Sequence, residues 1–231
     1  MAGSPGARVV RATLVPAALA YGVLATLRNR LYDTGWLPAR RVPARVVSVG
    51  NLSVGGTGKT PTALWLAERF AARGWRTAIV ARGYGKRRRG VVVVGEAGRP
   101  LVGPEEGGDE AVMLARRFRG PVVTGERRVE AASLACGRFA LDVVVLDDGF
   151  QHRALARDAD LVLATQDRRV TWTLPAGPLR EPRAANPRRC VPAQPVPVQP
   201  PVSGSPGRRE PAWVRRGGRP CAGAARRAPP R

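Results

Sequence analysis

The chain has 231 residues and a formal net charge of +22, with 39 lysines and arginines against 17 acidic residues. This length allows one or two domains with a sizeable core, and three widely spaced cysteines exclude a disulfide-rich secreted scaffold and fit a reducing cytoplasm. The charge comes almost wholly from arginine in a chain rich in Ala, Gly, Pro and Val, so basicity alone identifies neither nucleic acid nor a membrane surface nor a phosphorylated substrate as partner.

Residues 12–27 form an uncharged, largely apolar stretch with Arg8 and Arg11 before it and Arg28 and Arg30 after it. The stretch is slightly short for a membrane span. We expect an amphipathic or monotopic helix at the cytoplasmic face of a membrane, where the arginines meet anionic lipid. A helix packed on its own domain is the alternative.

The segment SVGNLSVGGTGKTP at residues 48–61 has the pattern of a phosphate-binding loop, with a β-branched run before it and an apolar helical pattern after it. Glycines let backbone N–H groups face phosphate oxygens, the lysine adds a point charge, and the threonine hydroxyl can bind Mg²⁺. A serine stands where the motif has its first glycine. The predicted nucleotide-binding residues are Ser53, Val54, Gly55, Gly56, Thr57, Gly58, Lys59 and Thr60.

From residue 45 to about 165, β-rich runs alternate with helical patterns, which predicts an α/β fold with a mostly parallel sheet flanked by helices, as in P-loop NTPases. Ligands are then expected at the carboxyl ends of the strands. The predicted strands are Arg45–Val49, Thr77–Ala81, Val91–Val94, Pro121–Thr124, Asp142–Leu146 and Asp160–Ala164, and the predicted helices are Pro61–Arg73, Asp109–Phe118 and Arg128–Cys136.

Three short motifs carry polar residues beside glycine or proline. In ARGYGK, glycines flank Tyr84 between Arg82 and a lysine, a combination that suits an anionic or sugar ligand. In GGDEA, Asp109 stands at a helix start, where an acid also serves as an ordinary cap. The turn LPAGPLREP carries Arg180 and Glu181. Alone, each motif is weak.

The run LDVVVLDDGFQHR at residues 141–153 is a buried strand that ends in acids, the arrangement that places a carboxylate beside Mg²⁺ at a phosphate loop. Asp147 or Asp148 would hold the metal directly or through water. Adjacent residues of a strand point to opposite faces, so we do not expect both to be direct ligands. His152, the single histidine, can orient an acid, touch substrate or be structural.

Residues 183–231 contain half of the chain's 22 prolines, eleven arginines and one acid, Glu210. No apolar run is long enough for a strand, so we predict a disordered segment. Either a flexible basic tail or a shifted reading frame in GC-rich DNA explains this composition.

Taken in order, SVGNLSVGGTGKTP, ARGYG, GDEA, DVVVLDDGFQHR and LPAGPLREP closely resemble the tetraacyldisaccharide 4′-kinase family of lipid A biosynthesis. The resemblance extends from about Tyr21 to Pro182, and the family's loop also lacks glycine at the position of Ser53. It implies transfer of the ATP γ-phosphate to the 4′-hydroxyl of a tetraacylated glucosamine disaccharide 1-phosphate, with Mg²⁺, at the cytoplasmic face of the bacterial inner membrane. The predicted parts are a helix and connector at 1–44, a P-loop kinase core at 45–182 and the tail at 183–231.

The resemblance also implies roles for single residues. Lys59 and Thr60 would hold phosphates and Mg²⁺, and Asp148 with Asp147 would serve the metal. Asp109 would be the base that takes the proton of the acceptor hydroxyl. The further residues are Glu181, near nucleotide and metal, and the substrate candidates Arg82, Tyr84, Gln151 and His152.

The family continues for well over a hundred residues after the LREP motif, with a second domain that closes over the site and supplies a histidine partner to the catalytic aspartate. Nothing after Pro182 matches it, and no histidine follows His152. We therefore expect a truncated or frameshifted product with impaired phosphoryl transfer, because an open site admits water and leaves the acceptor unpositioned.

Two other functions compete with this interpretation. A membrane-recruited P-loop switch or partitioning-type ATPase would hydrolyse ATP without any lipid acceptor. Nucleic-acid binding through the tail is disfavoured because Trp213 is the one aromatic residue available there for base stacking. We therefore expect no nucleic-acid partner.

Overall fold

The computed structural model describes residues 5–55, 57–163, 172–182 and 191–192, of which 5–11 and 191–192 are described by their backbone alone. Every described residue belongs to one unit, Met1–Gln199. The predicted disordered segment 183–231 lies outside the described residues except for 191–192. The proposed boundaries at residues 44 and 182 stay predictions.

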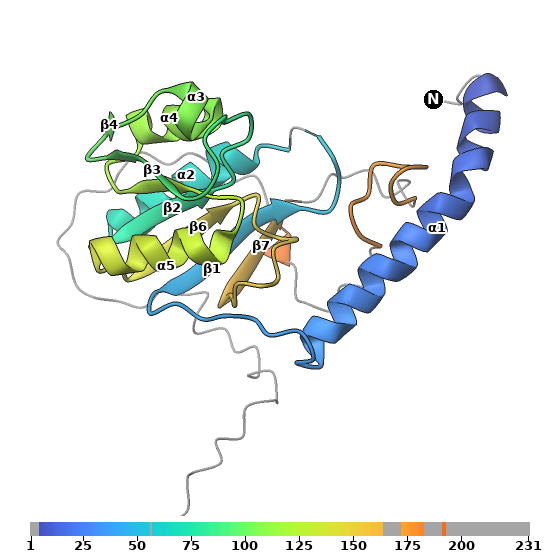
Figure 1. The fold of residues 1–231 in the computed structure, drawn as a ribbon, viewed down its shortest axis with the longest axis horizontal. Helices are drawn as coiled ribbons and strands as arrows, with labels where there is room; N and C mark the ends of the chain where they lie inside the picture. The colour runs from blue at the N-terminus through green and yellow to red at the C-terminus, as the bar shows by residue number, and fades with distance from the viewer. Residues whose placement is uncertain (1–4, 56, 164–171, 183–190, 193–231) are drawn as a thin grey trace, which may run out of the picture. The chain divides into compact units, whose positions relative to one another are not determined.

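A mixed β-sheet forms the centre of the described part (Figure 1). Its strand order is β4-β3-β5-β2-β6-β1-β7-β8, and all neighbours from β5 to β8 are parallel, whereas β3 pairs antiparallel with both β5 and β4. The strands are β1 (Arg45–Asn51), β2 (Thr77–Ala81), β3 (Val92–Glu96), β4 (Arg99–Pro100), β5 (Val122–Thr124), β6 (Val143–Asp147), β7 (Ala159–Leu163) and β8 (Val191–Pro192). The helices are α1 (Pro5–Asp33), α2 (Lys59–Ala71), α3 (Pro104–Gly107), α4 (Asp109–Arg117) and α5 (Arg128–Phe139).

The predicted mostly parallel α/β architecture is confirmed, and each predicted strand and helix of the core appears within a few residues of its expected bounds. Helix α2 begins at Lys59, two residues before the predicted start at Pro61. Proline is tolerated in the first turn of a helix, so Pro61 does not mark the helix start. Three short elements, β4, α3 and β8, were not predicted, since runs of two to four residues show no hydrophobic period.

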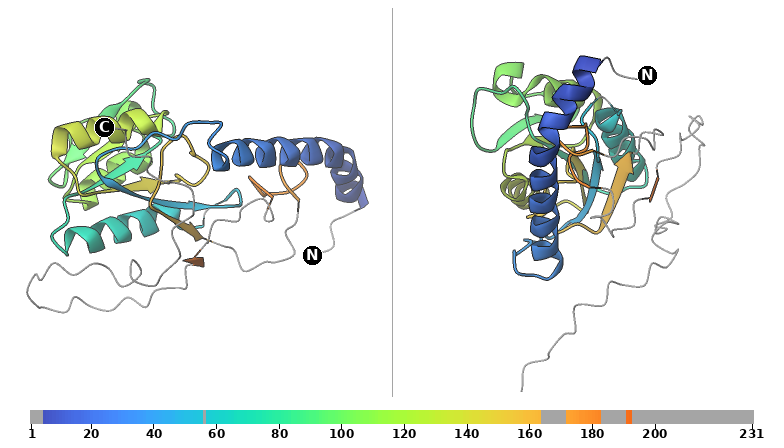
Figure 2. Two further views of the ribbon diagram at one scale, coloured as in Figure 1. Left: turned by 90° about the horizontal axis from the view of Figure 1, so that it is seen from below. Right: turned by 90° about the vertical axis from the view of Figure 1, so that its right-hand side faces the viewer.

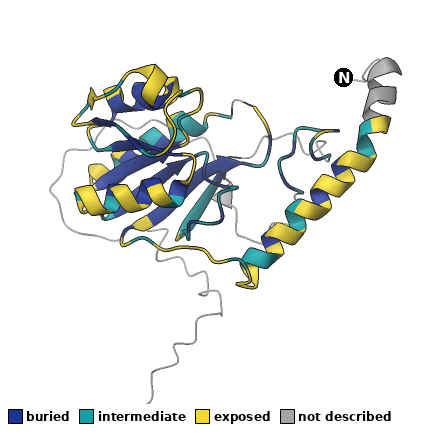
Figure 3. Ribbon diagram, viewed as in Figure 1, coloured by how far each residue is buried: buried dark blue, intermediate teal, exposed yellow. Residues whose placement is uncertain are grey.

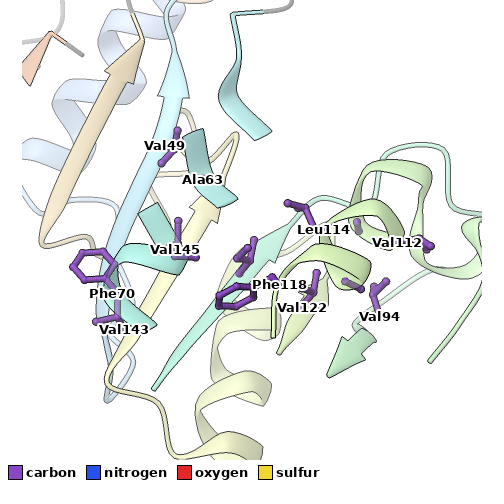
Figure 4. Packing of buried hydrophobic residues seen from close by; sticks show 14 of the residues in the cluster. Val49, Ala63, Phe70, Val94, Val112, Leu114, Phe118, Val122, Val143 and Val145 are labelled. Carbon is purple, nitrogen blue, oxygen red and sulfur yellow. The ribbon is translucent and has the colours of Figure 1, made fainter. Parts of the chain in front are cut away.

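Helices cover both faces of the sheet (Figure 2). On one face, α2 packs over Val49, Val143 and Val145 of β1 and β6, and α4 packs over Val94 and Val122 of β3 and β5 (Figure 4). On the other face, α5 packs over β2 and β5, and Val80 and Val123 of these strands share one cluster with Val144 and Leu146 of β6. Successive side chains of a strand point to opposite faces, so the unbroken apolar runs fill two cores at once. Each fully buried valine or leucine contributes about 1.5–3 kcal/mol.

Helix α1 is longer than the predicted stretch, and among its residues 12–33, whose side chains the structure describes, the buried ones lie along one stripe (Figure 3). Ala18, Gly22 and Asn29 form the buried stripe, whereas apolar residues such as Val23 and Leu24 remain exposed. The Thr173 hydroxyl donates to the Ala18 carbonyl at 2.8 Å, so α1 contacts the segment 172–182. Among the described residues, no helix is long and apolar enough to cross a membrane.

Candidate active site

The carboxyl ends of four neighbouring parallel strands meet at one edge of the sheet. Val49, two residues before the end of β1, pairs with Asp147 at the end of β6, and on the other side of β6 Val80 of β2 pairs with Leu146. Ala81 in turn pairs with Thr124, the last residue of β5. The phosphate loop, the paired aspartates, the ARGYG motif and the segment after β5 therefore all begin at this edge, as expected for a ligand site in a parallel sheet.

The predicted phosphate loop joins β1 to α2. Gly58 adopts a left-handed backbone (φ 75°) directly before α2 begins at Lys59, a conformation that a side chain disfavours. The Lys59 ammonium Nζ donates to the Gly55 carbonyl at 3.3 Å, and Asn51 Nδ2 donates to Thr57 Oγ1 at 2.8 Å. Gly56 lies outside the described residues. The N-terminal end of α2 thus faces the loop and provides positive potential for phosphate.

The LPAGPLREP segment pairs with this loop although more than a hundred residues separate them. Ser53 forms an antiparallel bridge with Leu179, the Val54 N–H donates to the Pro178 carbonyl at 2.7 Å, and the Arg180 N–H donates to the Leu52 carbonyl at 2.7 Å. The Val54 N–H therefore already has a hydrogen-bond partner within the protein. The same pairing brings Arg180 and Glu181 to the loop.

Asp147 is buried at the end of β6. The Thr60 hydroxyl is close enough to its carboxylate to favour the charged form, and Asp147 Oδ1 has no hydrogen-bond partner among the described residues. Burial, with the nearby charges of Glu110 and Asp148, raises the pKa of Asp147 to about 6 despite Thr60 and Lys59, which oppose the shift. A buried carboxylate oxygen without a partner is expensive, and a cation or its water would satisfy it.

Asp148 has a different environment. Its backbone is left-handed (φ 50°), uncommon for a residue other than glycine, and both carboxylate oxygens accept from Arg180 Nη1 at 3.0 Å. Arg180 also donates to Gln151 Oε1 at 3.3 Å, and Gln151 Nε2 donates to the Asn51 carbonyl at 2.9 Å. The DDGFQHR turn is thus joined to β1 and to the LREP segment by one set of hydrogen bonds.

Arg128 is a buried cation at the start of α5. Its Nη1 donates to the Gly125 and Glu126 carbonyls, and its Nε has no partner in the described part of the chain. Burial, and then the positive charge of Arg82, lowers its pKa to about 10, while Asp148 and Asp147 act in the opposite direction. Arg128 therefore stays positively charged close to both aspartates.

His152 is neutral and structurally engaged. Its Nε2 accepts the Arg128 backbone N–H at 3.2 Å, which leaves the ring proton on Nδ1. Burial, followed by the charges of Arg128, Arg28, Arg157 and Arg82, lowers the pKa of His152 to about 4. The histidine thus orients the start of α5, and a contact with substrate stays a prediction.

The GGDEA and ARGYG motifs lie against each other. Gly108 has φ 88°, and a Cβ there would lie 2.8 Å from the Tyr84 carbonyl oxygen. A Cβ on Gly83 would lie 3.0 Å from the Gly107 carbonyl oxygen. Close approach of the two backbones therefore requires glycine on both sides. Asp109 is exposed in the first turn of α4, and Tyr84 is exposed by 82%.

The structure brings most of the predicted residues to one edge and adds others. Lys59 and Thr60, the two aspartates and the ARGYG and GGDEA motifs gather there. Sequence reasoning missed Arg128 and gave Arg180 no role. Arg128 follows the end of a predicted strand by a few residues, and ligand sites in parallel sheets lie at the ends of strands. This position could have indicated Arg128 as a site residue. No pattern in the sequence indicated that Asn29 contacts Glu181.

Residues 10–191 match the family model for Tetraacyldisaccharide-1-P 4′-kinase, which is most of the chain. The chain belongs to the tetraacyldisaccharide 4′-kinase family. Similar curated proteins include the Tetraacyldisaccharide 4′-kinases of Anaeromyxobacter sp. (strain K), 50% identical over 177 residues, and of Chlorobaculum tepidum, 49% identical over 175 residues. These matches cover 75% and 73% of this chain, but only 47% and 50% of the relatives.

A solved structure of this family is also similar. It is described as an "apo" form of LpxK from Aquifex aeolicus in complex with ATP, and it matches with a TM-score of 0.71 and 40% identity. The match covers 76% of this chain and 56% of that one. The chain thus spans about half the length of the family members that it matches.

Proposed function

We propose that this chain transfers the γ-phosphate of ATP to the 4′-hydroxyl of a tetraacylated glucosamine disaccharide 1-phosphate in lipid A biosynthesis. Membership of the family, whose curated relatives carry this activity in their name, supports the substrate and the reaction. The observation that carries the proposal is the convergence of the phosphate loop, the buried Asp147 and the Asp148–Arg180 pair at one edge of the sheet.

ATP would bind with its phosphates against the loop at the start of α2. The glycine N–H groups of the loop and the Lys59 ammonium would bind the β- and γ-phosphates, whereas the Thr57 N–H already donates to the Gly55 carbonyl at 3.1 Å. Arg128, a buried cation whose Nε has no partner among the described residues, would donate a hydrogen bond to a phosphate oxygen as well. Glu181 would lie beside the nucleotide because the neighbouring Arg180 N–H pairs with Leu52 in the loop.

The residues at this edge fit a divalent cation. The unpartnered Asp147 Oδ1 and the adjacent Thr60 hydroxyl are hard oxygen donors of the kind that Mg²⁺ prefers. We assign Asp147 as the direct ligand, since both oxygens of Asp148 already accept from Arg180. Bound Mg²⁺ would supply positive charge to the β- and γ-phosphate oxygens. Asp148 would then act by orienting Arg180 and the turn around it.

In the transfer itself, the acceptor 4′-oxygen forms a bond to the γ-phosphorus while the bond from that phosphorus to the β–γ bridging oxygen breaks and ADP leaves. Asp109 would take the hydroxyl proton. Its position in the first turn of α4, against the ARGYG motif, supports this role. Arg82, Tyr84, Gln151 and His152 would line the path of the sugar acceptor.

We further propose that α1 seats the chain on the cytoplasmic face of the inner membrane. Apolar side chains of α1 stay exposed, among them Val23 at 67% and Leu24 at 64%, and Trp36 follows the helix with 82% exposed. Exposed apolar residues flanked by Arg28 and Arg30 suit an anionic lipid surface, which also carries the acylated acceptor. The helix would lie on the membrane and not cross it.

The decisive experiment is phosphorylation of a tetraacyl disaccharide 1-phosphate in mixed micelles with labelled ATP. We expect transfer that depends on Mg²⁺ and disappears in Lys59→Ala. ATP hydrolysis that is independent of the lipid would instead favour the P-loop switch ATPase, which the family match does not favour. ATP binding without transfer would mean that this chain is the ATP-binding part of the enzyme alone.

A further inference from the structure

The last turns of α1 contact the proposed site directly. Asn29 is 1% exposed, and its Nδ2 donates to Glu181 Oε2 at 3.0 Å, across 152 residues of sequence. Glu181 is itself 3% exposed. A buried carboxylate needs hydrogen-bond donors, and a bond between an amide and a charged acceptor is among the stronger ones that proteins form.

Asn29 is held from its other side as well. Its backbone carbonyl accepts from Arg153 Nη1 at 2.9 Å, and Arg153, which is buried, forms an ion pair with Asp33 at the end of α1. One turn of α1 thus contacts both the DDGFQHR turn, through Arg153, and the LREP segment, through Glu181. The backbone of Asn29 is thus fixed at this turn, and its buried side chain reaches Glu181 through Nδ2, while its Oδ1 has no hydrogen-bond partner among the described residues.

The position of Glu181 affects the proposed site because its sequence neighbour, Arg180, contacts both the phosphate loop and Asp148. The preceding Arg180 binds Asp148 with its side chain, and its backbone N–H pairs with Leu52 in the phosphate loop. A shift of Glu181 would therefore move a segment that touches both the loop and the acids.

We propose that Asn29 is a positioning residue for Glu181, so that α1 is a structural part of the nucleotide site. This inference rests on the proposed function for the presence of MgATP beside Glu181. It goes beyond that function because it gives α1 a role in the site apart from contact with lipid.

The test is a double-mutant cycle on MgATP affinity in the full chain, measured by isothermal titration calorimetry. Asn29→Ala should weaken MgATP binding about tenfold or more, as the loss of a partner that orients a site carboxylate typically does. In a Glu181→Gln background, the same substitution should change affinity less than about twofold, because its effect passes through the carboxylate. Equal effects in the two backgrounds, or no effect in either, would overturn the proposal.

Two variants separate positioning from packing. Asn29→Asp keeps the shape of the side chain but sets a second carboxylate against Glu181, so it should bind MgATP more weakly than Asn29→Ala at pH 7.5. If Asn29 only filled space, the aspartate variant would bind like the unchanged chain. Thr26→Ala is the matched control, because the Thr26 hydroxyl donates at 2.7 Å to Gly22 of its own helix. It should leave the affinity unchanged.

A second readout needs no nucleotide. The unchanged chain, Asn29→Ala, Glu181→Gln and the double variant are unfolded in urea without ATP. We expect the effects of the two substitutions on the free energy of unfolding to be non-additive. If the unchanged chain binds no ATP, the proposed function fails, yet the unfolding cycle still decides the inference. Additive losses there would show that Asn29 does not hold Glu181.

Discussion

At the scale of single residues, Asp147 and Asp148 are sequence neighbours with different partners. Asp147 has an unpartnered oxygen and the Thr60 hydroxyl, whereas Asp148 is bound by Arg180. We predict that Asp147→Asn reduces the Mg²⁺ dependence of ATP affinity about tenfold or more. Asp148→Asn should change it less than about threefold and instead lower stability by about 1 kcal/mol through the lost ion pair. Calorimetric titrations of ATP at several Mg²⁺ concentrations, with urea unfolding alongside, measure both. Equal losses of Mg²⁺ dependence would contradict the assignment of Asp147 as direct ligand.

His152 should leave a signature in the pH dependence of stability. Its pKa is about 4 when folded and about 6.5 when unfolded, so between these values the unfolded chain binds more protons. The contribution of His152 to stability should therefore fall as pH decreases from about 6.5 towards 4, whereas Asp147, whose pKa is raised to about 6, acts in the opposite direction, so the effect of His152 is read as a difference from a variant without the histidine. The loss is roughly 1–2 kcal/mol once the partial exposure of the ring is allowed for.

His152→Gln is the matched variant, because its amide oxygen can accept the same Arg128 N–H without titrating. Urea unfolding at pH 7.5 and pH 5 should show a smaller loss for this variant than for the unchanged chain. NMR of the single histidine gives an independent check, since the ring should stay neutral at pH 5.5. A histidine that titrates near its ordinary value would refute the prediction.

At the scale of elements, the contact between the ARGYG and GGDEA motifs depends on glycine. Gly108→Ala adds a Cβ within 2.8 Å of the Tyr84 carbonyl oxygen at φ 88°, so we expect a loss of about 2–4 kcal/mol. Gly98→Ala is the control, because Gly98 has φ 76° but nothing within 4 Å of a Cβ. That change should cost only about 1–2 kcal/mol. Chemical denaturation compares the two. Similar losses would mean that the backbone contact is not tight.

The exposed side of α1 gives a second prediction at this scale. Leu24→Asp should weaken binding to vesicles of anionic phospholipid about tenfold or more, since it removes an apolar side chain from the lipid-facing surface and adds a negative charge. Leu134→Asp on α5 is the control, because Leu134 is also exposed but lies on the core domain. Flotation of the chain with vesicles measures both. Equal binding of the two variants would mean that α1 is not the contact surface.

The elements also separate what the sequence predicts from what it does not. Runs such as Val143–Asp147 are long and apolar enough to predict a buried strand, and strands alternating with helices predict a parallel sheet. The antiparallel pairing of β3 was not foreseen, since chain direction leaves no mark on a five-residue strand. The site followed from strand ends and motifs, whereas the pairing of Ser53 with Leu179 depends on tertiary contacts that no local pattern encodes.

At the scale of the whole described chain, three distant segments depend on one another. The phosphate loop pairs with Pro178–Arg180, Arg180 binds Asp148, and Asn29 of α1 contacts Glu181. A ligand that binds the loop should therefore stabilise all three segments together, because it favours the state in which these hydrogen bonds are formed.

We predict that MgATP slows amide hydrogen exchange in residues 172–182 and in the last two turns of α1, as well as in the phosphate loop. Exchange measured by mass spectrometry with and without MgATP provides the test. Lys59→Ala, which should not bind the nucleotide, is the control for effects of ligand addition alone. The exposed turn between β3 and β4 is far in sequence from the loop and forms none of these hydrogen bonds, so its exchange should not change. Protection confined to residues 52–62 would show that the loop binds nucleotide independently of α1 and the LREP segment.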